Sequence, residues 1–202
     1  MSIPSHPLKI NGKVIRRAVE IGAGDSYSSE LISYGTHVER VELWEPNAIL
    51  ARDLLNKAGG NVITHCAAIS ISDFAGKANL YSLGYSSYLQ GAPSFIALSV
   101  EEGSAECFWA PLVQKVYVYS IIEIDYGDID LLVLTCHGSE LSILSHMVSR
   151  PVCIRTKYYC HNQAHWRYYN EITSWMNING YKHRVLDTNQ HGTFFHIEWT
   201  KI

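Results

Sequence analysis

The chain has 202 residues, of which 47% are hydrophobic and 17% charged, with a net charge of -3. This composition fits one globular domain with a substantial core and excludes a disordered protein. Lysine and arginine number 16 against 19 acidic residues, without a basic stripe, which argues against a nucleic-acid partner. The N-terminus lacks a signal-like apolar stretch, and no apolar run reaches 18 residues, so we expect no membrane partner. The five cysteines form no CxxC pair, which favours a reducing, cytoplasmic location.

The first third of the chain alternates between strand and helix patterns. Strands are expected over residues 17–22, 38–44 and 61–69, with helices over 26–34 and 47–58. Asp25 or Ser26 would cap the first helix and Asn47 the second. Such alternation predicts right-handed βαβ units in a mostly parallel, doubly wound α/β sheet.

The middle of the chain is less regular, and the alternation then resumes. Short strands are indicated over 76–82 and around 115–122, and the segment 83–111 is either a binding segment or a surface loop. Later strands are expected over 130–136 and 151–159, later helices over 139–149 and 163–178, and a closing antiparallel hairpin over 181–188 and 193–200. The whole chain, residues 1–202, is therefore expected to form a single domain.

One motif stands where ligands bind in such sheets, at the carboxyl end of the first strand. Glu20, Gly22 and Gly24 form an E-x-G-x-G pattern, and Glu45 ends the second strand. The third glycine of the dinucleotide motif is missing, which disfavours an NAD-dependent oxidoreductase. A nucleoside with a positively charged amino-acid end suits both carboxylates, and S-adenosylmethionine (SAM) is such a ligand. The alternatives are a tight turn without a ligand and, for Glu45, a solvated acid.

Four blocks in this order resemble the FkbM-type SAM-dependent methyltransferases. They read "VEIGAGDSYS", "VELWEPN", "NVITHCAAIS" followed by Gly76, and "DIDLLVLTCHGSELSIL". The resemblance implies the seven-stranded sheet of class I methyltransferases. It also implies SAM as cofactor, with the methionine end bordered by Glu20, Gly22, Ala23 and Gly24. Glu45 would take the ribose, Pro46 would turn the chain, and Cys66 and Ala67 would lie beside the adenine.

The chain departs from the family after the fourth strand, where the usual pattern is K-I-D-x-E-G-x-E. Here the lysine, the aspartate and the first glutamate are replaced by Val133, Thr135 and His137, while Gly138 and Glu140 remain. The resemblance favours O-methylation of a small-molecule hydroxyl, on a sugar or a secondary metabolite. His137 is then the candidate general base, with a helix-capping or loop histidine as the alternative, and Glu140 would orient either His137 or the substrate. The alternative is a degenerate domain that binds a nucleoside or a partner without methyl transfer.

Further candidates are weaker. Ser86, Ser87 and Thr135 are candidate contacts of the acceptor substrate. Cys160, His161 and His165 have a spacing that resembles metal ligands, but no fourth ligand is evident. We therefore expect no metal.

Overall fold

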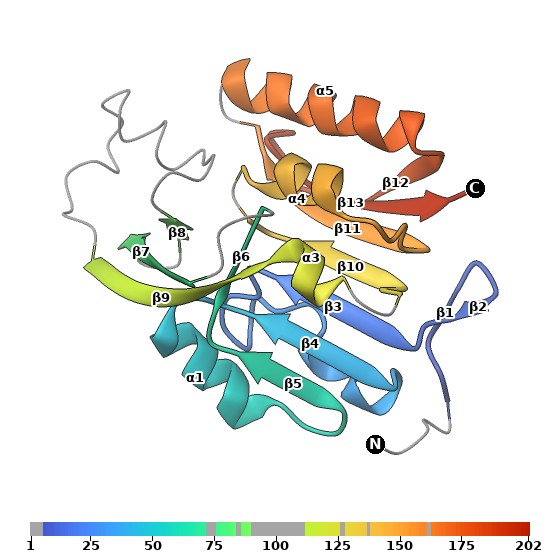
Figure 1. Ribbon diagram of the computed structural model, residues 1–202. Helices are drawn as coiled ribbons and strands as arrows, with labels where there is room; N and C mark the ends of the chain where they lie inside the picture. Colours follow the sequence, from blue (N-terminus) through green and yellow to red (C-terminus); the bar gives the residue numbers. More distant parts are fainter. Residues whose placement is uncertain are drawn as a thin grey trace.

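The computed structural model describes residues 6–71, 76–83, 86–89, 112–125, 128–136, 138–160 and 163–202. A seven-stranded sheet forms its centre, in the order β12-β13-β11-β10-β3-β4-β5 (Figure 1). The strands are β3 (Arg17–Ile21), β4 (Arg40–Trp44), β5 (Val62–His65), β10 (Leu131–Leu134), β11 (Cys153–Tyr159), β12 (Tyr181–Thr188) and β13 (Phe194–Lys201). β13 pairs antiparallel with both neighbours, and the other pairs are parallel. This confirms the predicted α/β sheet with its C-terminal antiparallel hairpin.

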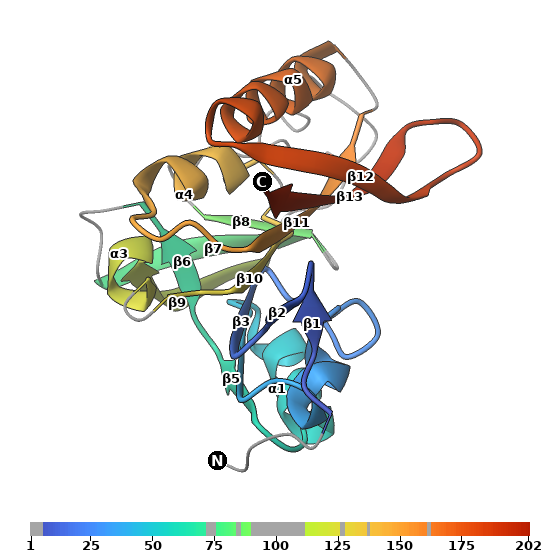
Figure 2. The ribbon, with the colours of Figure 1, turned by 90° about the vertical axis from the view of Figure 1, so that its right-hand side faces the viewer.

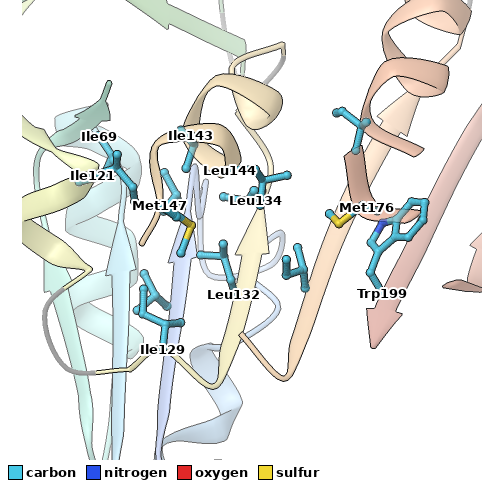
Figure 3. Packing of buried hydrophobic residues seen from close by; sticks show 14 of the residues in the cluster. Ile69, Ile121, Ile129, Leu132, Leu134, Ile143, Leu144, Met147, Met176 and Trp199 are labelled. Atoms are coloured by element: carbon cyan, nitrogen blue, oxygen red, sulfur yellow. The ribbon is translucent and has the colours of Figure 1, made fainter. Parts of the chain in front are cut away.

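Helices cover both faces of the sheet (Figure 2). α1 (Ala48–Lys57) and the 3₁₀ helix η1 (Ile32–Thr36) lie on one side, and α3 (Ile121–Ile124), α4 (Glu140–His146) and α5 (Gln163–Ile178) lie on the other. Leu131 and Val133 pack on the first side, whereas Leu132 and Leu134 pack on the second. Figure 3 shows Leu132 and Leu134 beside Ile143, Leu144 and Met147 of the α4 region. Burial on both faces explains why this strand is a continuous apolar run.

A second, four-stranded sheet adjoins the carboxyl ends of β4 and β5 (Figure 1). It consists of β6 (Ala68–Ser70), β9 (Leu112–Ser120), β7 (Gly76–Leu83) and β8 (Ser86–Leu89), in that order. The predicted strand over 61–69 is therefore two strands, and the chain leaves the main sheet at Cys66 and Ala67. A small N-terminal hairpin, β1 (Lys9–Ile10) and β2 (Lys13–Val14), completes the described strands.

Two predicted helices are wrong in extent, and side-chain carboxylates explain both. Asp25 accepts the N–H groups of Tyr27 and Ser28, as a helix N-cap does, and Ser29 N–H donates to Asp25 O, so a single turn forms. The N–H groups of Glu30 and Leu31 donate instead to the Glu20 carboxylate, which takes them out of a helical ladder, and turns and η1 replace the predicted helix over 26–34.

The helix over 139–149 ends at His146 instead. The N–H groups of Val148 and Ser149 donate to the Asp125 carboxylate, which holds the chain out of helical geometry. The helix over 163–178 and the Asn47 cap of α1 are confirmed. Within the described ranges, no helix combines the length and the apolar character needed to cross a membrane.

Candidate functional site

The loop Gly22–Gly24 is wedged between the ends of two strands. The N–H groups of Gly22 and Ala23 donate to Trp44 O, at 2.9 and 3.2 Å, at the end of β4. Gly22 has a φ of +77°, and a Cβ at this position would lie 2.2 Å from Thr135 O, just beyond β10. The left-handed backbone and the missing side chain are both required here, so glycine is a steric necessity.

Glu45 joins this loop to the end of β4 and the start of α1. Its Oε2 accepts the N–H of Gly24 at 2.9 Å, and its Oε1 accepts the N–H of Asn47 at 2.8 Å. The residue is only 5% exposed, which rules out the solvated-acid interpretation. Burial raises the pKa of Glu45 to about 7, against the opposing effect of these two hydrogen bonds. Pro46 lies half-buried between the two contacts.

The end of β5 lies next to Glu45, because Glu45 N–H donates to His65 O at 3.0 Å. Cys66 is exposed and Ala67 is buried. Partial burial and the nearby Glu45 raise the pKa of the Cys66 thiol, which places the two side chains in one electrostatic environment. The predicted cofactor residues Gly22, Gly24, Glu45 and Cys66 are thus gathered at one edge of the sheet.

Glu20 also lies at this edge, but its carboxylate is turned into the fold. It accepts hydrogen bonds from Ser29 Oγ at 2.8 Å and from the N–H groups of Glu30 and Leu31 at 3.0 Å. Burial, the dominant effect, raises its pKa to about 7. These contacts show that Glu20 holds the chain that follows the loop.

Glu140 has a comparable set of internal contacts. It accepts the N–H groups of Cys136 and Gly138, at 2.8 and 2.9 Å, and the hydroxyl of Tyr168 at 3.0 Å. Both carboxylate oxygens therefore stabilise the turn between β10 and α4. Cys136 lies against the core and donates its thiol to Ile21 O, and burial raises its pKa, so the structure gives it no thiolate character.

The remaining acceptor-side residues are described only in part. His137, the candidate base, lies outside the described residues. Ser86 and Ser87 lie on β8, whose side chains are likewise not described. Thr135 follows β10, and its hydroxyl is buried without a hydrogen-bond partner in the described chain. Across those same described ranges, no group of three or more His, Cys, Asp and Glu residues could hold a metal ion; His161 is among the residues left out.

An aromatic cluster beside Glu45 was not foreseen from the sequence. Trp44 stacks on His65 with ring centroids 3.9 Å apart, and Tyr119 of β9 meets Trp44 edge-on at 5.5 Å. Trp44 and His65 are register partners on β4 and β5, whereas Tyr119 comes from the other sheet. Only the meeting of the two sheets creates the cluster, and no local pattern indicates it.

Comparison with known proteins supports the architecture. No protein-family model matches the sequence, and no curated protein matches it either. A putative O-methyltransferase from Klebsiella pneumoniae has a TM-score of 0.50 and 16% identity, over 93% of this chain and 74% of that chain. The fold is that of the class I methyltransferases. A chain of the fibrillarin/Nop5p complex gives a TM-score of 0.50 and 12% identity, over 98% of this chain and 77% of that chain.

In this fold, the candidate cofactor residues lie at the same edge of the main sheet. β3, β4, β5 and β10 are adjacent and parallel, so their carboxyl ends share one edge of the sheet. Gly22, Glu45, Cys66 and Thr135 each follow one of these strands. In open α/β sheets this edge is where ligands bind.

Proposed function

We propose that the chain is a SAM-dependent O-methyltransferase of the FkbM type, formed by one domain over residues 1–202. The contact between Gly24 N–H and Glu45 Oε2 carries the proposal, because it places a buried carboxylate directly against the glycine loop. At identities of 16% and 12%, the solved structures support the fold and leave the activity to be tested.

The hydrogen-bond acceptor capacity of Glu45 fits the nucleoside part of SAM. In the described chain, each carboxylate oxygen of Glu45 accepts one backbone N–H. A carboxylate oxygen has a second acceptor site, so the group retains capacity for the two hydroxyls of a ribose. Cys66 and Ala67, at the end of the neighbouring strand, would border the base.

Two buried carboxylates make the site favourable for a cation. Glu20 interacts electrostatically with Glu45 and adds to the cost of charging Glu45. A positive amino-acid end near Gly22, Ala23 and Gly24 would relieve that cost. Bound SAM would supply an electrophilic methyl group, and the chain would mainly align the acceptor and exclude water.

The acceptor is proposed to be a small molecule with a hydroxyl on a sugar or a secondary metabolite, in a reaction without a metal. His137 would accept the hydroxyl proton, with Thr135, Ser86 and Ser87 as acceptor contacts. Glu140 would act by fixing the turn that carries His137, since its oxygens already hold Cys136 and Gly138. His137→Asn should then lower turnover roughly a hundredfold, without weakening the binding of the cofactor.

A second candidate function is a domain that binds the nucleoside without transferring a methyl group. The hydrogen bonds of Glu140 favour this function. Glu140 is the one acid retained from the family pattern, and it binds Cys136 N–H and the Tyr168 hydroxyl within the fold. Both candidates predict binding of SAM and S-adenosylhomocysteine, and only the first predicts turnover.

Isothermal titration calorimetry with SAM, S-adenosylhomocysteine and NAD tests the shared prediction. We expect heat from both sulfur ligands and none from NAD. Heat from NAD alone would overturn the proposal. Methylation of a panel of sugar and polyketide hydroxyls, with wild type beside His137→Asn, then separates the two functions.

A further inference from the structure

Residues 25–36, which we name the strap, connect the glycine loop to the chain before β4. A regular helix was expected here, and only the short η1 is present. Backbone hydrogen bonds of a long helix therefore do not hold the strap. Its position depends on side chains from other elements, among them Glu20 of β3.

The second anchor of the strap is an ion cluster on β11 and β13. Glu30 forms an ion pair with Arg155 Nη1 through Oε1, and its Oε2 lies 3.0 Å from His196 Nε2. Arg155 also binds Glu198 Oε2 at 2.8 Å and donates to Tyr34 Oη at 3.3 Å. Arg155 thus contacts the strap at two places, Glu30 and Tyr34.

The register of the sheet explains how these charges meet. Glu20, Val133, Arg155, Glu198 and Arg184 are successive partners across β3, β10, β11, β13 and β12. Partners in one row point to the same face of a sheet. The strap crosses this row, and Glu30 lies over Arg155.

The titratable groups around Glu30 come from each element packed against the strap. Arg155 and His196 meet the Glu30 side chain, Glu20 accepts its N–H, Tyr34 and Glu198 contact Arg155, and Lys157 donates to Ser28 O. Arg184 joins the cluster from its exposed side through Glu198 Oε1 at 2.7 Å, and Asp187 is the register partner of His196. Cys153, on the same face of β11, stays neutral because burial raises its pKa to about 12.

Arg155 is the permanent cation of this cluster. Its side chain is 13% exposed, and those of Glu30 and Glu198 are 12% and 6% exposed, so the ion pairs are poorly screened. Burial alone would raise the pKa of Glu30, but His196 and Arg155 outweigh it and hold the pKa below its usual value. Without Arg155, His196 would be the remaining basic side chain within ion-pair distance of the Glu30 carboxylate among the described contacts.

We infer that Arg155 is a positioning residue that sets the glycine loop through Glu30 and the strap. The route is short: Gly24 borders the strap, and a turn of Asp25 and Ser28 leads to Ser29 and Glu30. Without the anchor at the Glu30 side chain, the far end of that turn is held by Glu20 alone among the described side-chain anchors of Glu30. The strap then has more freedom, and the position of the Gly24 N–H relative to Glu45 is less well defined.

Arg155→Met tests the inference, with Arg184→Met as matched control. Both arginines bind Glu198, but Arg184 is 70% exposed and has no contact with Glu30 among the interactions of the described chain. The primary measurement is hydrogen–deuterium exchange of residues 22–34 in ligand-free protein. We expect Arg155→Met to lose protection there by about tenfold or more, the size of a lost buried charged hydrogen bond. Arg184→Met should retain it.

Rescue by a conservative variant distinguishes positioning by charge from general support of the fold. Arg155→Lys keeps a cation beside Glu30 and Glu198, so it should restore part of the protection of residues 22–34 that Arg155→Met loses.

Equal protection of residues 22–34 in Arg155→Met and Arg184→Met would overturn the inference. Loss of protection throughout the sheet in Arg155→Met would indicate general destabilisation. In that case, exchange of residues 22–34 is measured in Glu30→Gln, which leaves the Arg155–Glu198 pair in place. Normal protection of residues 22–34 in Glu30→Gln would then overturn the inference.

The consequence for cofactor affinity rests on the proposed function. S-adenosylhomocysteine should bind Arg155→Met about tenfold or more weakly than Arg184→Met. If wild type binds neither sulfur ligand while Arg155→Met still loosens residues 22–34, the proposed function fails and the positioning role stands.

Discussion

The backbone N–H of Gly24 donates to Glu45 Oε2 at 2.9 Å, which joins the end of β4 to the loop after β3. The second oxygen of Glu45 holds Asn47, the N-cap of α1. One carboxylate therefore connects two strand ends and a helix start. Any ligand hydroxyl that binds Glu45 shares its oxygens with these backbone groups.

Glu45→Ala should weaken S-adenosylhomocysteine binding by about 1–3 kcal/mol, the usual effect of removing a charged partner from a buried hydrogen bond. Calorimetry measures this, and circular dichroism checks that the fold persists. Glu39→Ala is the control, because Glu39 lies just before β4 with its side chain 45% exposed. An unchanged dissociation constant for Glu45→Ala would confine Glu45 to a structural role.

Stability should fall as pH rises from about 4.5 to about 7. Burial raises the pKa values of Glu20 and Glu45 from 4.5 to about 7, so across this window the folded state retains protons that the unfolded state has lost. Each group's contribution is complete below pH 4.5 and is lost above pH 7. At 1.36 kcal/mol per pKa unit, it is on the order of 3 kcal/mol.

Urea denaturation of wild type and Glu20→Gln across this window measures the effect. Glu20→Gln cannot titrate, so its stability should change less with pH. Glu42→Gln serves as control, because ion pairing with Arg17 and Arg40 and a contact with His65 outweigh burial and lower the pKa of Glu42 to about 2. The stability that Glu42 contributes is lost only below about pH 4.5, so Glu42→Gln should retain the wild-type slope. Identical slopes for wild type and Glu20→Gln would refute the assignment.

Gly22→Ala should destabilise the protein far more than Gly12→Ala. Both glycines have left-handed backbones, with φ of +77° and +78°, which costs an alanine about 1–2 kcal/mol. Only at Gly22 would the new Cβ meet the backbone, 2.2 Å from Thr135 O, whereas Gly12 has open space. We expect Gly22→Ala to lose about 1–3 kcal/mol more than Gly12→Ala, as is typical of overpacking. Similar denaturation midpoints for the two variants would show that the loop is not wedged against β10.

Tyr168→Phe should destabilise the turn between β10 and α4. The Tyr168 hydroxyl donates to Glu140 at 3.0 Å and accepts the N–H of Leu141 at 2.9 Å. Its removal leaves the half-buried Leu141 N–H without this partner and the buried Glu140 with one hydrogen bond fewer, at a cost of about 1–3 kcal/mol. Thermal denaturation measures the loss, and Tyr27→Phe is the control because Tyr27 is 92% exposed. Equal melting temperatures would argue against a structural role for Glu140.

The sequence by itself determined the fold class and which residues lie at the edge of the sheet where the candidate site is. The continuous apolar run over 130–136 and the alternation of strands and helices predict a parallel sheet, because burial on two faces requires apolar side chains throughout. The sequence also predicts that the glycines of the loop and Glu45 lie close together. Each follows the carboxyl end of a strand, and in a parallel sheet those ends meet at one edge.

Tertiary structure alone decided how the carboxylates are used. The sequence predicts that Glu20 borders the ligand and that Glu140 orients His137 or the substrate, but their partners in the structure, such as Leu31 and Tyr168, lie 11 and 28 residues away. The strap is not a helix for the same reason, since Glu20 binds amides that local propensity assigns to a helical ladder. Arg155 and Glu30 are 125 residues apart and meet only because the register of β3, β10 and β11 places Arg155 in the row of Glu20, which also binds Glu30. Local patterns record backbone preference and burial, whereas long-range charge pairing depends on which strands become neighbours.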